Sequence, residues 1–104
     1  MEGVKIENIE LLTPEERKIT EELVKEYYIK IKRKLKNSIT LKLYFKEHKK
    51  EGKGRKISIN AEVTSSTIMF RANAWDWDLA RTVHKVMNKI LSETEHRFKA
   101  SEQK

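Results

Sequence analysis

The sequence predicts an α+β fold of the order (β)-α-β-β-β-α, in which two helices pack on one face of an antiparallel sheet. Two long segments, 13–36 and 76–98, carry apolar residues at helical spacing along one side. Between them, three segments within 38–74 alternate apolar with polar residues, as half-buried antiparallel strands do. Packing both helices on the apolar face of the sheet buries every apolar stripe at once. The 104 residues are enough for a single domain spanning 1–104.

The start of the first helix has a clear signature. Thr13 can cap the helix, Pro14 suits its first turn, and Glu16 stands three residues after the cap, as a capping box requires. The alternation before it is weak, so whether residues 1–12 add a short edge strand stays open. The apolar side of this helix comprises Ile19, Leu23, Val24, Tyr27, Tyr28, Ile31 and Leu35.

The second half of the chain predicts a hairpin, a tight turn and the last helix. Gly52 and Gly54 among lysines indicate a loose loop from Glu47 to Arg55. Asp76 is expected to cap the last helix, and residues 99–104 form a tail. The apolar stripe of this helix consists of Leu79, Val83, Val86, Met87, Ile90, Leu91 and Phe98.

Positive charge is concentrated in the middle third of the chain. The formal net charge is +7, and residues 23–56 carry thirteen basic groups against three acidic ones. Lys18, Lys25, Lys32 and Lys36 fall within about 40° of one another on a helical wheel, opposite the apolar side. Such a stripe suits a polyanion such as a phosphate backbone. Lysine-rich helix faces are also common where a helix simply faces water, and that alternative stays open.

The sequence indicates no enzyme, cofactor, metal site or small-molecule substrate. Cysteine is absent, the three histidines are not at ligand spacing, and no glycine-rich phosphate loop follows a strand. Apolar runs are only two or three residues long, so no membrane span is expected. No signal region is recognisable at the N-terminus, which predicts a cytoplasmic protein.

Exposed aromatic and apolar residues leave two questions open. Trp75 and Trp77 flank Asp76, and one of them is expected to seal the end of the core, with a base-stacking platform as the alternative. Tyr44, Met69 and Arg71 would lie on the open sheet face, which is either a dimer surface or exposed to water.

Several segments resemble the ribosome hibernation-promoting factor family. The resemblance rests on Arg71-Ala72-Asn73-Ala74, Asp78-Leu79-Ala80 and Asn88-Lys89-Ile90, and on Asn8-Ile9-Glu10 shortly before Thr13-Pro14. It implies a β-α-β-β-β-α fold close to the double-stranded-RNA-binding domain. It also implies binding between the head and body of the small ribosomal subunit, where mRNA and tRNA are blocked. The sequence departs from the family pattern at His84 and Asn88, where the family usually has Asp.

These observations predict a non-catalytic protein that binds rRNA of the small ribosomal subunit and modulates translation. The expected RNA-binding residues are Lys25, Lys32, Arg33, Lys36, Lys42, Lys46, Arg71, Arg81, Lys85 and Lys89. One alternative is a double-stranded-RNA binder, which the acidic Asp76 and Asp78 disfavour. The other is an interaction or dimerisation module that uses the open sheet face. The chain is expected to be a monomer or a weak homodimer.

Overall fold

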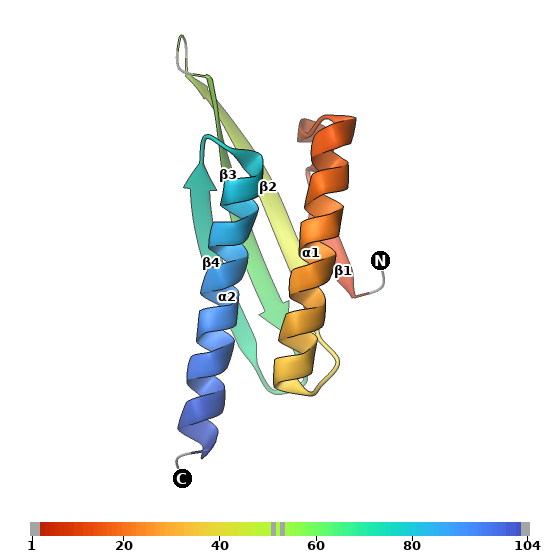
Figure 1. The fold of residues 1–104 in the computed structure, drawn as a ribbon, viewed down its shortest axis with the longest axis vertical. Helices are drawn as coiled ribbons and strands as arrows, with labels where there is room; N and C mark the ends of the chain where they lie inside the picture. The colour runs from red at the N-terminus through yellow and green to blue at the C-terminus, as the bar shows by residue number, and fades with distance from the viewer. Residues whose placement is uncertain (1–2, 51, 53, 103–104) are drawn as a thin grey trace.

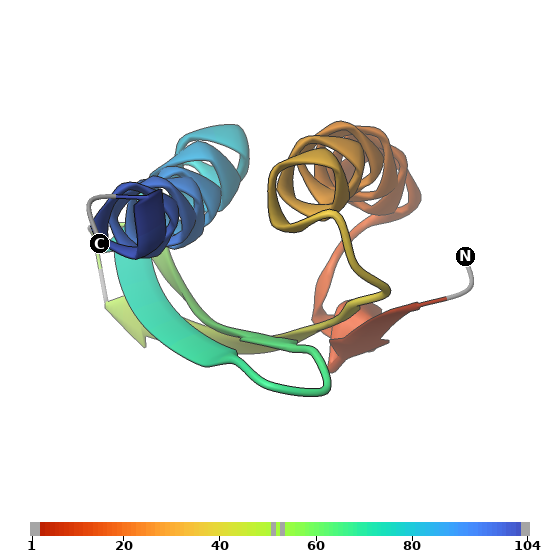
Figure 2. The ribbon, with the colours of Figure 1, turned by 90° about the horizontal axis from the view of Figure 1, so that it is seen from below.

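A computed structural model describes residues 3–50, 52 and 54–102 and has the predicted α+β architecture (Figure 1). Its elements are β1 (Val4–Glu7), a 3-10 turn η1 (Ile9–Leu11), α1 (Pro14–Leu35), β2 (Thr40–Lys50), β3 (Gly54–Thr64), β4 (Met69–Asp76) and α2 (Leu79–Glu102). The question left open for residues 1–12 is therefore answered, because a short edge strand forms there. Figure 2 shows both helices side by side on one face of the curved sheet.

The sheet is mixed, although the sequence predicts an antiparallel one. Its strand order is β1-β2-β3-β4, and β2, β3 and β4 pair antiparallel. Strand β1 instead pairs parallel with β2, with Val4 opposite Leu41 and Glu7 opposite Tyr44. The cause is the connection: α1 carries the chain back along the sheet, so β2 starts at the same end as β1.

The core lies between the helices and the inner face of the sheet. Most residues of the predicted apolar stripes are buried or half-buried there. Ile19 is an exception, because 43% of its surface stays exposed. It lies about 120° from Ile31 on the helical wheel, at the margin of the apolar side. The Phe98 side chain, predicted to extend the stripe of α2, lies outside the described part of the chain.

The hairpin between β2 and β3 is longer than predicted. Pairing continues to Lys50 opposite Gly54, so the expected loop from Glu47 to Arg55 is mostly strand. The extended hairpin projects beyond the end of the sheet at the top of Figure 1. Arg55 Nε lies 2.8 Å from Glu47 Oε2 on the neighbouring strand, an ion pair that links the two strands of the hairpin.

The helix starts follow their capping residues. At α1 the predicted capping box is confirmed: the Glu16 amide donates to Thr13 Oγ1 over 3.2 Å, and the Thr13 amide donates to Glu16 Oε1 over 2.9 Å. At α2 the cap is Asp78 rather than Asp76, since the Arg81 amide donates to Asp78 Oδ1 over 2.8 Å. Helix α2 then continues to Glu102, so most of the predicted tail is helical. Residues 103–104 lie outside the described part.

Candidate nucleic-acid interface

The ten predicted RNA-binding residues lie on three separate surfaces. Lys25, Lys32 and Arg33 project from α1, and Lys36 is the residue that caps its C-terminus; together they form what we call the α1 basic face. Lys42, Lys46 and Arg71 lie on the open sheet face, and Arg81, Lys85 and Lys89 lie where α2 meets the edge of β4. The ten residues therefore do not form one continuous surface.

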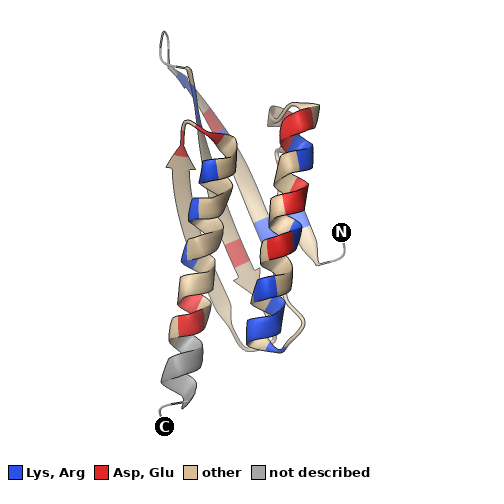
Figure 3. Ribbon diagram, in the orientation of Figure 1, with Lys and Arg blue, Asp and Glu red and all other residues tan. Residues whose placement is uncertain are grey.

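The α1 basic face consists of unpaired cations. All four side chains are exposed, and none has an ion pair or side-chain hydrogen bond to any other described residue. Nearby cations differ: Lys34 Nζ lies 2.9 Å from Glu95 Oε1 on α2, and Lys30 Nζ lies 5.3 Å from the centre of the Tyr27 ring. Figure 3 shows basic residues along the C-terminal part of α1 and acidic residues towards its start. Part of this arrangement favours the helix itself, because cations in the last turn interact with the negative end of its dipole.

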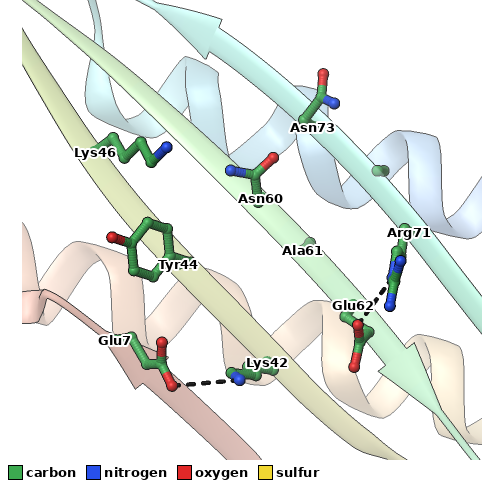
Figure 4. Close-up of a pocket in the computed structure, with 10 residues that line it drawn as sticks. Glu7, Lys42, Tyr44, Lys46, Asn60, Ala61, Glu62, Arg71 and Asn73 are labelled. Carbon is green, nitrogen blue, oxygen red and sulfur yellow. Dashed lines mark hydrogen bonds and ion pairs between the residues drawn. The ribbon is translucent and has the colours of Figure 1, made fainter.

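The open sheet face is polar and nearly charge-balanced (Figure 4). A shallow hollow of about 590 Å³ lies across β2, β3 and β4. Two predicted cations are paired there, with Lys42 Nζ 3.4 Å from Glu7 Oε1 and Arg71 Nε 3.0 Å from Glu62 Oε2. Lys46 lies over the Tyr44 ring at 5.7 Å from its centre. This face can offer hydrogen bonds and an aromatic ring, but its free positive charge is small.

At the edge of β4, lysines from α2 bind the strand. Lys89 Nζ donates to the Asn73 carbonyl over 2.7 Å, and Lys85 Nζ lies 2.7 Å from Asp76 Oδ2. The hydrogen bond from Lys85 holds the pKa of Asp76 below its ordinary value, with help from the amides of Asp78 and Trp77. Such lysines also protect an edge strand from pairing with another chain.

The contact between the helices explains why the basic surfaces are separated. Tyr27 Oη lies 2.7 Å from His84 Nδ1, which identifies the sides on which α1 and α2 meet. Burial raises the pKa of the Tyr27 hydroxyl, although a hydrogen bond with Asn88 acts in the opposite direction. Lys85 follows His84 directly but binds the edge of β4, away from α1.

The residues around the end of β4 differ from the sequence-based predictions in two ways. Neither tryptophan seals the core: Trp75 is 51% exposed and Trp77 is 46% exposed. The alternation along β4 places Trp75 on the open face and buries Asp76 instead. Lys56, which is not among the ten predicted residues, lies 4.3 Å from the centre of the Trp75 ring. In the sequence, Lys56 falls on the polar side of its predicted strand, and this alternation could have identified it as a candidate.

The described residues offer no site for metal chemistry. Within 3–50, 52 and 54–102, no three His, Asp or Glu side chains gather closely enough to hold a metal ion. Neither helix, over its described length, combines the length and apolar character needed to cross a membrane.

Comparison with known proteins identifies the fold. The N-terminal domain of Protein Y from Thermus thermophilus superposes with a TM-score of 0.64, at 16% identity, over 89% of this chain and 92% of that one. A ribosomal subunit interface protein from Coxiella burnetii superposes with a TM-score of 0.60, at 20% identity, over 93% of this chain and 94% of that one. This chain shares their fold. No protein-family profile and no curated protein sequence matches it.

Proposed function

We propose that this protein binds rRNA of the small ribosomal subunit and modulates translation without catalysing a reaction. Two independent observations support the proposal. The fold is that of a ribosomal subunit interface protein, and the segment from Arg71 to Ile90 resembles hibernation-promoting factors. A ribosome-bound protein of this kind would act in the cytoplasm, by occupying a site that mRNA or tRNA needs.

The α1 basic face carries the proposal. Its four cations are exposed and have no acidic partner among the described residues, whereas Lys42, Arg71 and Lys85 are each paired with a carboxylate. Unpaired cations can contact phosphates without first breaking an internal ion pair. Each such contact releases condensed counterions from the RNA, which makes binding dependent on salt.

The other two surfaces are proposed to contribute secondary contacts. Among the described residues, no carboxylate pairs with Lys46, and Lys89 binds only a carbonyl. Both side chains can therefore contact a phosphate without breaking an ion pair. Lys42, Arg71, Arg81 and Lys85 would have to exchange a carboxylate for a phosphate. We therefore rank them below the α1 basic face.

The decisive experiment reverses the charge of the α1 basic face. A variant with Lys25→Glu, Lys32→Glu and Lys36→Glu should lose co-sedimentation with small ribosomal subunits, by at least about 100-fold in affinity at moderate salt. For the unmodified protein, affinity should fall steeply across a salt series. Urea unfolding of the variant should show only a modest loss of stability, because exposed helix charges contribute little to folding.

A matched variant controls for net charge. Lys5→Glu, Lys49→Glu and Lys50→Glu change the same number of charges on β1 and at the far end of β2, away from α1. This variant should retain most of the binding. Equal loss in both variants would mean that only net charge matters, and unchanged binding in the first variant would exclude the α1 basic face. Comparable affinity for a bare RNA duplex would instead favour a general duplex-RNA binder.

A further inference from the structure

The tryptophan corner is a feature that the α1 basic face does not explain. We use this name for five residues around the C-terminal end of β4, contributed by β3, β4, the turn after it and α2: Lys56, Trp75, Trp77, Lys85 and Lys89. The two indole rings lie 6.3 Å apart between centres and are nearly perpendicular, at 87°. About half of each side chain is exposed to solvent. They are also the only two tryptophans in the sequence.

Three cations lie around the exposed Trp75 ring. Lys56 Nζ lies 4.3 Å from the centre of the Trp75 ring, which places it in a cation–π interaction. Beside Trp75, a hollow of about 530 Å³ is lined by Asn73, Ala74, Lys85 and Lys89. Each lysine that lines it already binds a carbonyl of β4, so both ammonium groups are held at its rim.

The two carboxylates nearby are already engaged. Asp76 is 8% exposed and accepts hydrogen bonds from Lys85 and from the amides of Trp77 and Asp78. Asp78 caps α2 through the Arg81 amide. Neither carboxylate therefore pairs with Lys56, which lies over the Trp75 ring, or with Lys89, which lines the hollow.

We propose that the tryptophan corner binds an unpaired nucleotide of an RNA strand. The base would stack on an exposed indole ring, and its phosphate would lie against Lys85 and Lys89. Exposed aromatic rings flanked by cations are what single-stranded nucleic acids require, since every base has a face that can stack and every linkage carries a negative charge. In a duplex the base faces are covered by their neighbours, so the proposal is restricted to single strands.

This inference rests on the proposed function and makes it more specific. Trp75 belongs to the open sheet face and α1 to the opposite face, so the corner and the α1 basic face are separate surfaces. Each can be altered without changing the other. A protein partner could also use exposed tryptophans, but the surrounding cations favour a polyanion.

Because no other tryptophans exist in the chain, intrinsic fluorescence reports directly on the corner. We would titrate the full chain with a single-stranded RNA of about eight nucleotides and with an abasic oligomer of equal length, a size in the range of single-strand binding sites. The RNA should quench the fluorescence and bind more tightly than the abasic oligomer. Trp75→Ala or Trp77→Ala should weaken RNA binding by about 5- to 100-fold and leave the abasic oligomer unaffected.

Conservative and remote variants complete the test. Trp75→Phe should retain most of the affinity, since a ring remains, and leaves Trp77 as the sole reporter. Met69→Ala removes an equally exposed apolar side chain from the other end of β4 and should change nothing. Circular dichroism identifies any variant that fails to fold, and the titration of the unmodified protein does not depend on the variants.

Failure of this inference is distinguishable from failure of the proposed function. Equal affinity for the RNA and the abasic oligomer would overturn base stacking, as would Trp→Ala variants that bind RNA normally. If the unmodified protein co-sediments with ribosomal subunits but neither oligomer changes its fluorescence, the corner is not a nucleotide site. The variant of the α1 basic face should lose ribosome binding and still be quenched by the RNA.

Discussion

At the scale of single residues, Arg55 shows how a basic side chain can be structural rather than functional. Its guanidinium donates to both oxygens of Glu16, each over 3.1 Å, and to the Leu11 carbonyl over 3.2 Å. It also pairs with Glu47 across the hairpin. One side chain thereby joins β3 to the start of α1, to the turn before it and to β2. Its charge is not available to RNA.

Arg55→Ala should lower the free energy of unfolding by about 1–3 kcal/mol, because the Glu16 carboxylate would lose a bidentate partner. Urea denaturation at pH 7 measures this. Arg71→Ala is the matched control. Arg71 pairs with Glu62, but its side chain is 71% exposed, so the free energy of unfolding should change by no more than about 0.5 kcal/mol. Equal effects in the two variants would contradict the structural role of Arg55.

The same pair predicts a dependence on pH. Burial acts to raise the pKa of Glu16, but hydrogen bonds from the Thr13 amide and Arg55 outweigh it and hold the pKa below its ordinary value. This stabilisation is present above the ordinary pKa of about 4.3 and is lost as the pH falls through the lower folded value. The stability difference between the unmodified protein and Arg55→Ala should therefore narrow below about pH 4. A difference that stays constant down to pH 2 would contradict this assignment.

At the scale of elements, β1 depends on a glycine that precedes it. Gly3 has φ +86°, and its carbonyl accepts from the Leu41 amide over 2.8 Å, which starts the pairing with β2. A Cβ at this position would collide with the Tyr28 hydroxyl and lie 3.2 Å from the Ile39 carbonyl oxygen. The start of β1 thus requires a glycine for two reasons: its positive φ and the lack of space for a Cβ.

Gly3→Ala should destabilise the fold by about 1–3 kcal/mol and increase amide hydrogen exchange in β1 and the start of β2. Gly52→Ala separates the two causes. Gly52 also has a positive φ, +75°, but no atom lies within 4 Å of the added Cβ. The Gly52 variant should therefore lose less stability, and its effect should stay within the hairpin. Equal losses would show that the contact with Tyr28 is unimportant.

At the scale of the whole molecule, the protein is elongated and its open face is polar. The Cα radius of gyration is 14.4 Å, against about 13 Å for a typical compact domain of this length. The projecting hairpin and the C-terminal part of α2 lie at opposite ends of the long axis (Figure 1). The open sheet face carries ion pairs and amides, and lysines occupy carbonyls along the edge of β4. The ion pairs and the covered carbonyls disfavour pairing with a second copy through the polar part of this face or the edge of β4.

We therefore expect a monomer. Light scattering coupled to size-exclusion chromatography should give a mass near 12.4 kDa that does not change with concentration. The variant Lys85→Ala, Lys89→Ala leaves the edge of β4 less protected and should associate more readily. A concentration-dependent mass for the unmodified protein would instead support the dimerisation module that the sequence left open.

Local sequence patterns were sufficient to predict most helices and strands and to tell their buried faces from their exposed ones. Periodicity identified both helices and three strands, and Thr13, Pro14 and Glu16 located the start of α1, because these signals involve residues only a few positions apart. The exposed positions of Lys25, Lys32 and Arg33 also follow from the helical wheel alone, whereas Lys36 caps the helix in a left-handed conformation.

Contacts between residues far apart in the sequence determined the features that local patterns did not predict. Parallel pairing of β1, exposure of both tryptophans and engagement of Arg55 by Glu16, 39 residues away, depend on which segments meet in space. The sequence alone determined that the protein is a basic α+β domain with a cationic helix face. Only the tertiary structure decided which cations are free, because a charge is available to RNA only when no carboxylate from another element lies beside it.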